Sequence, residues 1–186
     1  MTYPKDIMNE VLYTEEEIRK AANELAKRIN EDYNNKDLVL VCTLKGAVPF
    51  FSELIKGINI HCNMEFIKAS SYIGNTTTTI GNVQISTIMN FPVENKEVII
   101  VEDIVDTGIT LNTIVKLLKH RGANSVEIAC LLNKEARRVM PVDVKYSGFE
   151  VPDEFVIGYG LDYNEMYRNL PYVGVLKEEV YQRRED

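Results

Sequence analysis

The sequence lacks the features that would place the protein in a membrane or direct it out of the cell. Its longest apolar runs, such as Val98–Val101, are far shorter than the roughly 20 residues that a membrane-spanning helix needs. Residues 1–6 show no basic start followed by an apolar run, which is the pattern of a secretory signal. We therefore expect a cytoplasmic protein without a membrane partner.

Cysteine is scarce. Cys42, Cys62 and Cys130 are an odd number of thiols, they lie in apolar surroundings, and their spacing is not that of metal ligands. This pattern indicates reduced core residues in a cytoplasmic protein rather than disulfides or a structural metal site.

Basic charge is also in short supply, since 21 Lys and Arg residues face 28 Asp and Glu residues, for a net charge of −7. An acidic protein repels the phosphate backbone of DNA and RNA, so we expect no nucleic-acid partner, although a local basic patch stays possible. If the substrate carries a phosphate, local groups rather than net charge must hold it.

No repeat, low-complexity tract or Pro/Gly/Ser-rich linker divides the 186 residues. This length predicts a single domain that buries about 70% of the surface exposed by the unfolded chain. Such a domain needs no disulfides or structural metal to fold. Thr14 and Glu17 form a capping-box pattern at the start of a helix, and apolar residues follow at helical spacing to about Asn34. The alternation of buried strands with helices predicts a parallel α/β sheet with right-handed crossovers. The further expected strands are 38–43, 63–69, 83–88, 97–101, 125–132 and 155–158, and the further helices are 47–56 and 109–121.

Two acids come directly after the strand at 97–101. Glu102 and Asp103 follow four β-branched residues, so they are expected at the carboxyl end of a parallel strand, where α/β proteins bind ligands. The next helix begins just beyond them, and its first N–H groups and positive dipole end suit a phosphate.

The turn between that strand and that helix has the right residues for a phosphate cradle. Gly108 lets the backbone approach a ligand closely, and Thr107 and Thr110 add hydroxyl donors. The structural alternative is that Asp106 or Thr107 simply caps the helix and that the two preceding acids are solvated.

The whole pattern resembles the phosphoribosyl-pyrophosphate (PRPP) motif of the type I phosphoribosyltransferases. The resemblance implies that Glu102 and Asp103 contact the ribose hydroxyls and that the loop 106–110 binds the 5′-phosphate. It implies the fold of that family, a central parallel sheet flanked by helices with a small hood subdomain. The core would span about 14–135, and the hood would combine about 136–186 with the N-terminus.

The resemblance covers nearly the whole chain and is closest to the 6-oxopurine branch of the family. Leu44-Lys45-Gly46-Ala47 is similar to its pyrophosphate loop, in which the Leu–Lys peptide is typically cis. Asn133-Lys134 resembles its base-recognition lysine, and the segment 155–165 with Arg168 resembles its C-terminal purine and metal segment. Ala47 and Ile109 depart from the usual Gly and Lys or Arg, which leaves the affinity for PRPP open.

The implied reaction is the transfer of 5-phosphoribosyl from PRPP to hypoxanthine or guanine, which yields a nucleoside monophosphate and pyrophosphate in purine salvage. A preference for xanthine is an alternative, and so is a non-catalytic nucleotide sensor that binds RNA. The family forms dimers and tetramers, so a homodimer or homotetramer is expected.

By the same resemblance, Asp106 would be the general base near the purine N7. Mg²⁺ would be held by Asp162, with Glu102 and Asp103 acting through ribose hydroxyls or water. The remaining pyrophosphate contacts would come from Lys45, Gly46 and Arg168, although a surface ion pair is the ordinary role of such an arginine.

For the base, Lys134 would donate to the exocyclic O6, which adenine lacks. Phe155 would stack on the purine, and the backbone of Val156 and Asp162 would accept from a guanine 2-amino group. A strand-end surface lysine and a core aromatic are the structural alternatives for the two side chains.

The segment Ser70–Asn82 is polar and contains glycines near both ends. Its Ser71-Tyr72 pair matches the start of the mobile lid in the 6-oxopurine branch, and a lid would exclude water from the reacting centre. A plain β-hairpin fits the same residues.

Overall fold

The computed structural model describes residues 6–72, 82–87 and 92–182. Six strands form one sheet in the order β4-β3-β2-β5-β6-β7. Five of them run parallel, and β4 pairs antiparallel with β3 at one edge, so the predicted parallel α/β sheet is confirmed. The strands are β2 (Leu38–Leu44), β3 (Cys62–Tyr72), β4 (Asn82–Thr87), β5 (Glu97–Val105), β6 (Ser125–Asn133) and β7 (Tyr146–Glu150).

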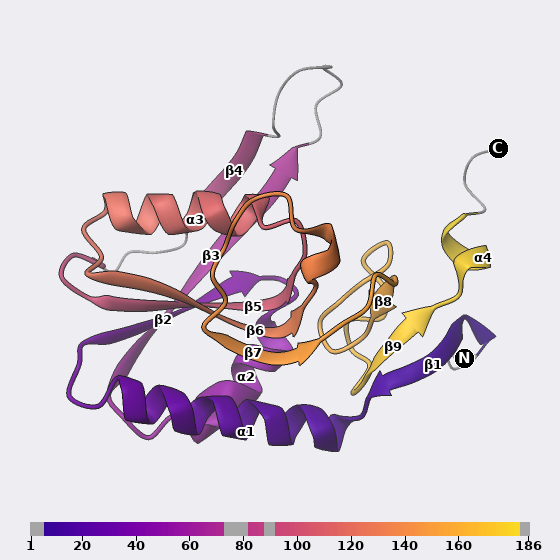
Figure 1. Ribbon diagram of the computed structural model, residues 1–186, viewed down its shortest axis with the longest axis horizontal. Coiled ribbons are helices and arrows are strands. Elements are labelled where there is room, and N and C mark those ends of the chain that lie inside the picture. Colours follow the sequence, from indigo (N-terminus) through magenta and orange to yellow (C-terminus); the bar gives the residue numbers. More distant parts are fainter. Residues whose placement is uncertain (1–5, 73–81, 88–91, 183–186) are drawn as a thin grey trace.

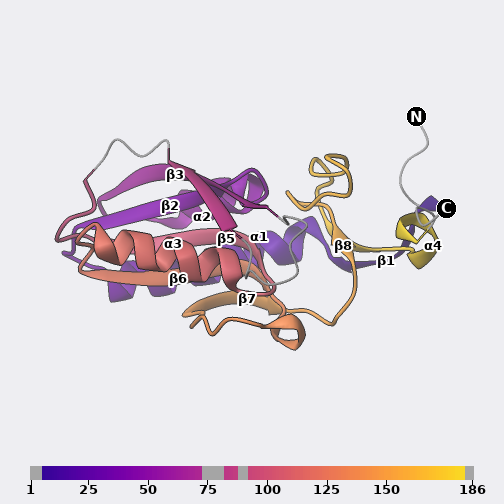
Figure 2. The same ribbon diagram turned by 90° about the horizontal axis from the view of Figure 1, so that it is seen from above.

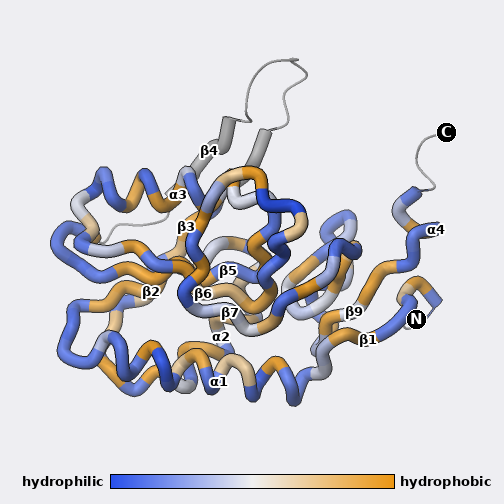
Figure 3. The backbone as a smooth tube through the Cα atoms, viewed as in Figure 1, coloured by the Kyte–Doolittle hydropathy of each residue, from blue (hydrophilic) through white to orange (hydrophobic). Residues whose placement is uncertain are grey.

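Helices cover both faces of this sheet. The two helices α1 (Glu15–Asp32) and α2 (Val48–Gly57) lie on one face, and α3 (Ile109–His120) lies on the other (Figure 1). Successive residues of β2 alternate between the two cores, with Leu40 packed on the side of α1 and α2 and Val41 on the side of α3. Figure 3 shows hydrophobic residues along the central strands and mixed colouring along the helices.

The predicted capping box at the start of α1 is present. The backbone N–H of Thr14 donates to Glu17 Oε2 at 2.8 Å, and the Thr14 hydroxyl accepts from the backbone N–H of Glu17. The apolar residues at helical spacing are all buried, so this helix forms as its sequence indicates. Among the described residues, no helix combines the length and apolar content needed to cross a membrane.

The strand that carries the two acids is longer than its apolar run predicts. β5 continues to Val105, so Glu102 and Asp103 lie within the strand rather than after its end, and the expected end at Val101 was wrong. The reason is the neighbouring strand, because β6 keeps pairing with β5 as far as Val105 opposite Asn133. Backbone hydrogen bonds to a neighbour outweigh the low strand propensity of acidic side chains.

The cysteines are free thiols. Cys42 and Cys130 are buried as expected, and burial raises the pKa of Cys42 to about 12 and also raises the pKa of Cys130. Cys62, at the start of β3, is only partly buried, but it packs against the core on the side of α1 and α2.

A second, three-stranded sheet has the order β1-β9-β8 and stands beside the large one (Figures 1 and 2). It joins β1 (Met8–Tyr13) to β9 (Val173–Leu176) and β8 (Val156–Ile157), so that residues from both ends of the chain pair. The short helix α4 (Glu178–Tyr181) follows β9. By contrast, β7 belongs to the large sheet, although it lies in the segment 136–186 that the sequence assigned to the hood.

Candidate active site

The acidic pair of β5 lies in a pocket of about 270 Å³ at the carboxyl end of the sheet. Asp103 is only 9% exposed, and its Oδ1 accepts from the backbone N–H of Ile104 at 2.8 Å. Burial raises the pKa of Glu102 well above its ordinary value, and the adjacent charge of Asp103 raises it further. The pocket is lined by Ala69, Glu102, Asp103, Ile104, Asp106, Thr107, Gly108, Thr110 and Leu111, which brings together the predicted ribose and phosphate residues.

The turn that follows β5 lines this pocket. Gly108 has φ +78°, a conformation that favours glycine, and it stands at the N-terminus of α3 without any side-chain cap. Asp106 Oδ1 accepts no hydrogen bond from this helix, so the structural alternative in which Asp106 caps it is wrong, and the other candidate cap, Thr107, makes only one long bond. Thr107 Oγ1 accepts from the backbone N–H of Ile109 at 3.5 Å, a weak bond that leaves the first turn of α3 accessible to a ligand.

Arg138 holds the backbone of this turn in place, a role that no sequence motif indicates. Its guanidinium donates to the carbonyls of Val105 and Asp106 and to Asn133 Oδ1, the last at 2.6 Å. The same segment supplies two backbone N–H groups to the Thr107 carbonyl, at 3.0 and 2.9 Å. The turn is thus positioned by residues 32 and 33 positions further along the chain, which no local pattern could reveal.

The predicted pyrophosphate loop meets the acidic pair. The Leu44–Lys45 peptide is cis, as the resemblance implied. A Cβ built on Gly46 would lie 1.7 Å from Asp103 Oδ2, and a Cβ built on Gly160 would lie 1.9 Å from the Gly46 carbonyl oxygen. Three segments that are distant in sequence therefore converge on Gly46, and only glycine fits there.

The C-terminal segment brings Asp162 and Arg168 together. Arg168 pairs with Asp162 Oδ1 at 2.7 Å and donates to the Gly160 carbonyl at 2.8 Å. Glu165, which sequence reasoning did not single out, accepts from Lys45 Nζ at 2.6 Å and pairs with Arg168 at 3.3 Å. The ion pair expected as the structural alternative for Arg168 is present, but its partners are residues of the candidate site.

Lys134 is not the surface lysine that its position at a strand end suggests. It is 5% exposed, and its Nζ donates to the Glu154 carbonyl at 2.7 Å and pairs with Asp153 at 3.2 Å. Its backbone N–H donates to the Val105 carbonyl at 2.9 Å, which ties it to the phosphate turn. Lys134 therefore links the turn to the segment that precedes Phe155.

Phe155 is not a core residue, since it is 39% exposed. Its ring stacks on Tyr181 of α4 with centroids 5.3 Å apart, and Tyr163 meets it edge-on at 5.8 Å. Val156, the next residue, is buried and pairs with Val175 in the small sheet. The aromatic ring is thus held in a fixed position by the C-terminal elements.

Two side-chain atoms of the predicted site are left without partners. Among the residues that the structure describes, Asp106 Oδ1 and Arg168 Nε are the buried side-chain nitrogen and oxygen atoms that make no hydrogen bond. A buried polar group without a protein partner costs free energy, so each such group requires an explanation, and a role in binding or catalysis is one. Asp106 Oδ1 is an acceptor, and Arg168 Nε is a donor.

A family model for the phosphoribosyl transferase domain matches residues 8–164. The chain belongs to the phosphoribosyltransferase family. It is 51% identical over 174 residues to a hypoxanthine-guanine phosphoribosyltransferase of Staphylococcus aureus, and the match covers 94% of this chain and 97% of that protein. A protein of the same name from Staphylococcus epidermidis is 50% identical over 179 residues, covering 96% of this chain and 99% of that one.

Solved structures agree with this assignment. A hypoxanthine phosphoribosyltransferase from Staphylococcus aureus superimposes with a TM-score of 0.90 at 49% identity and covers 95% of each chain. The Trypanosoma cruzi enzyme gives a TM-score of 0.90 at 38% identity, covering 100% of this chain and 98% of that one. The expected fold class of this phosphoribosyltransferase is thereby confirmed.

The residues of this phosphoribosyltransferase fit a magnesium ion held partly by its substrate. The described residues contain no group of three or more His, Cys, Asp and Glu side chains that could hold a metal alone. Mg²⁺ uses one or two carboxylates together with phosphate oxygens and water, so the acidic pair beside Gly46 suits it.

The predicted lid is described only at its two ends. Ser71 and Tyr72 continue β3 and pair with Val83 and Asn82 of β4, so these backbone positions belong to an antiparallel hairpin. Residues 73–81 lie outside the described part of the phosphoribosyltransferase, and so do the side chains of the lid pair.

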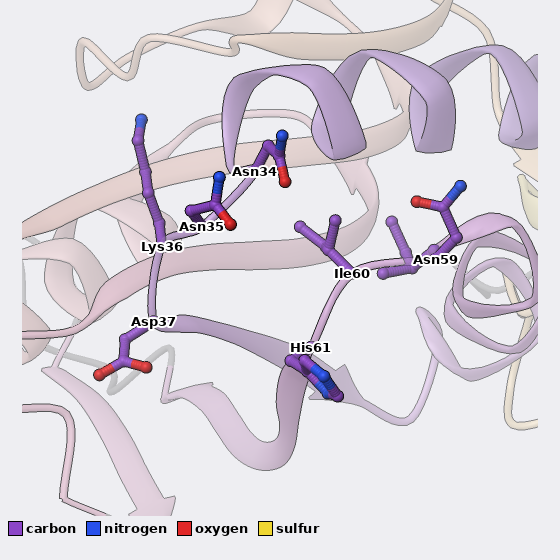
Figure 4. Close-up of a pocket in the computed structure, with 8 residues that line it drawn as sticks. Asn34, Asn35, Lys36, Asp37, Asn59, Ile60 and His61 are labelled. Atoms are coloured by element: carbon purple, nitrogen blue, oxygen red, sulfur yellow. The ribbon is translucent and has the colours of Figure 1, made fainter.

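A larger pocket, of about 590 Å³, lies at the opposite end of the sheet (Figure 4). It is formed by the loops that precede β2 and β3, whereas ligands of parallel α/β sheets bind at the carboxyl ends of strands. None of its residues was predicted to act in catalysis. Its lining residues are Asn34, Asn35, Lys36, Asp37, Ile58, Asn59, Ile60 and His61.

Proposed function

We propose that this phosphoribosyltransferase transfers 5-phosphoribosyl from PRPP to hypoxanthine and guanine in purine salvage. The names of its relatives support the choice of bases. The observation that carries the proposal is the buried, unpartnered Asp106 Oδ1 beside the phosphate turn. In the reaction the bond from C1′ to the purine nitrogen forms, the bond from C1′ to the pyrophosphate oxygen breaks, and the purine loses a proton.

Asp106 takes that proton as the general base. Its free oxygen is an acceptor already withdrawn from water, so a purine N–H can bind there without displacing another hydrogen bond. The backbone of Asp106 stays in place when its side chain turns, because Arg138 Nε donates a hydrogen bond to the Asp106 carbonyl at 3.0 Å. Fixed geometry of this kind lowers the entropy that the transition state must lose.

The 5′-phosphate binds to the turn Asp106–Thr110. The N-terminus of α3, where Thr107 makes only one weak bond, offers backbone N–H groups and the positive end of the helix dipole, and the threonine hydroxyls add donors. Glu102 and Asp103 in the same pocket accept hydrogen bonds from the ribose hydroxyls.

The leaving pyrophosphate is held by Lys45, Gly46 and Arg168. Arg168 Nε is a buried donor without a partner, and it suits an anionic oxygen. We propose Mg²⁺ as the cofactor, held by Asp162 and, through ribose hydroxyls or water, by Glu102 and Asp103. When bound, Mg²⁺ would neutralise charge on the pyrophosphate.

The purine lies between the phosphate turn and the small sheet. Lys134 donates to its O6, Phe155 stacks on its ring, and the backbone of Val156 and Asp162 accepts from the guanine 2-amino group. Selectivity for 6-oxopurines follows because Lys134 can donate but cannot accept, whereas adenine carries an amino donor at that position. The low exposure of Lys134 strengthens this discrimination.

The test is pyrophosphate release from PRPP and Mg²⁺ with hypoxanthine, guanine, xanthine or adenine as the base. We expect turnover with hypoxanthine and guanine and none with adenine. Turnover with xanthine alone would contradict the proposed bases, and absence of turnover with every base would contradict catalysis itself.

We also propose that the protein is cytoplasmic and forms a homodimer or homotetramer. Three free thiols suit a reducing compartment.

The oligomer is supported by Met64 and Phe66, which lie on the same face of β3 and are 52% and 37% exposed. A second copy of the chain would cover these two apolar side chains. Sedimentation equilibrium tests this, since Met64→Lys should yield smaller species, and a wild-type monomer would contradict it.

A further inference from the structure

Glu165 joins the two cations that flank the candidate pyrophosphate site. Its Oε2 accepts from Lys45 Nζ at 2.6 Å, and its Oε1 lies 3.3 Å from Arg168 NH2. Lys45 lies 120 positions earlier in the chain, so this contact closes the pyrophosphate loop onto the C-terminal segment. Each oxygen of one carboxylate thus contacts one of the two cationic side chains.

A carboxylate and a phosphate present the same chemistry to Lys and Arg, namely anionic oxygens that accept charge-assisted hydrogen bonds. We propose that Glu165 occupies the place of the pyrophosphate group in the ligand-free enzyme, and that PRPP must displace it to reach Lys45 and Arg168. This inference rests on the proposed roles of those two cations. It makes Glu165 a residue that weakens PRPP binding, although it touches no reacting atom.

The local structure lets Glu165 leave without disturbing its neighbours. Its side chain is 65% exposed and that of Lys45 is 59% exposed, so both can turn into water. Arg168 keeps its bonds to Asp162 and to the Gly160 carbonyl when Glu165 departs. The competing groups therefore separate while the guanidinium stays in place.

The negative charge of Glu165 is stabilised by the two cations that it contacts. The Lys45 ammonium that donates to it, together with Arg168, holds the pKa of the Glu165 carboxyl below its usual range. Its backbone has φ +64°, in the left-handed region that Asn tolerates best among non-glycine residues. Two neutral substitutions are therefore available, Glu165→Gln with the same shape and Glu165→Asn with a shorter side chain suited to the backbone.

The experiment compares the wild-type protein with both variants at low salt. It measures KM for PRPP, KM for hypoxanthine and kcat, and it measures the Kd of magnesium pyrophosphate by calorimetry. The matched control is Glu15→Gln, which removes the same charge from an exposed ion pair on α1. Thermal unfolding confirms that each variant is folded.

We expect both variants to lower KM for PRPP and Kd for pyrophosphate by about two- to fivefold, the range for exposed ion pairs. KM for hypoxanthine should stay unchanged, as should every constant of the control, and added salt should shrink the difference. An unchanged or raised Kd for pyrophosphate in the variants would overturn the proposal. If the wild-type protein showed no transferase activity, the proposed function would fail, while the calorimetric comparison would still decide the role of Glu165.

Discussion

The carboxylate of Asp103 lies against Gly46 so closely that a Cβ at position 46 would stand 1.7 Å from Asp103 Oδ2. This approach joins β5 to the loop after β2, and it places the predicted ribose-binding acid beside the predicted pyrophosphate loop. We expect Gly46→Ala to push Asp103 away and to reduce kcat/KM for PRPP by roughly 10²-fold, the scale for a misplacement of about 1 Å.

Steady-state kinetics with varied PRPP check this expectation. The melting temperature separates a local effect from a loss of fold, because the Asp103 side chain can turn before the backbone must move. Unchanged kcat/KM in a folded Gly46→Ala protein would contradict the close approach.

Asp106→Asn should retain PRPP binding and lose about 10²- to 10⁴-fold in kcat, the usual contribution of general-base catalysis. The amide keeps the shape of the side chain but cannot take a proton at neutral pH. Single-turnover rates with hypoxanthine measure the effect, and Asp143→Asn, at an exposed position, serves as the control. Turnover close to that of the wild type would remove Asp106 from the role of base.

Lys134→Gln should raise KM for hypoxanthine and guanine and leave KM for PRPP nearly unchanged, because the proposed contact is to the base alone. Some loss of stability should accompany it, since Lys134 also holds the Glu154 carbonyl and Asp153. Lys20→Gln on the exposed side of α1 is the matched control. A change in KM for PRPP without a change for the purines would assign Lys134 to the phosphate side instead.

Glu102→Gln should stabilise the metal-free protein at neutral pH. The folded pKa of Glu102 lies above its ordinary value, so the folded state holds this proton more tightly than the unfolded chain does. Ionising it therefore costs folding free energy, and the cost appears as the pH rises through the ordinary Glu pKa and is complete above the raised one.

Melting temperatures from pH 4 to pH 8 test this. The advantage of Glu102→Gln over the wild type should be small at the acid end and should grow with pH, by about 2–4 °C for each kcal/mol of penalty removed. Glu15→Gln should show no such growth. A difference that is constant over the pH range would mean that ionisation of Glu102 does not destabilise the folded protein.

The sequence by itself determined the features that depend on local pattern. The capping box of Thr14 and Glu17, the helix after it and the doubly buried strand β2 form as their residues indicate, because spacing and side-chain chemistry within a few residues decide them. The phosphate turn was recognisable for the same reason, since its acid, threonine and glycine residues are contiguous.

Tertiary structure alone decided the features that depend on distant partners. β5 runs on to Val105 because β6 pairs with it, and β1 exists because β9, from the other end of the chain, lies beside it. Asp106 Oδ1 is left without a partner because Arg138 and its neighbours bind only the backbone of the turn. Glu165 meets Lys45 across 120 positions of sequence. Periodicity carries no information about such contacts, because they arise when the packing of the whole chain brings remote groups within hydrogen-bond distance.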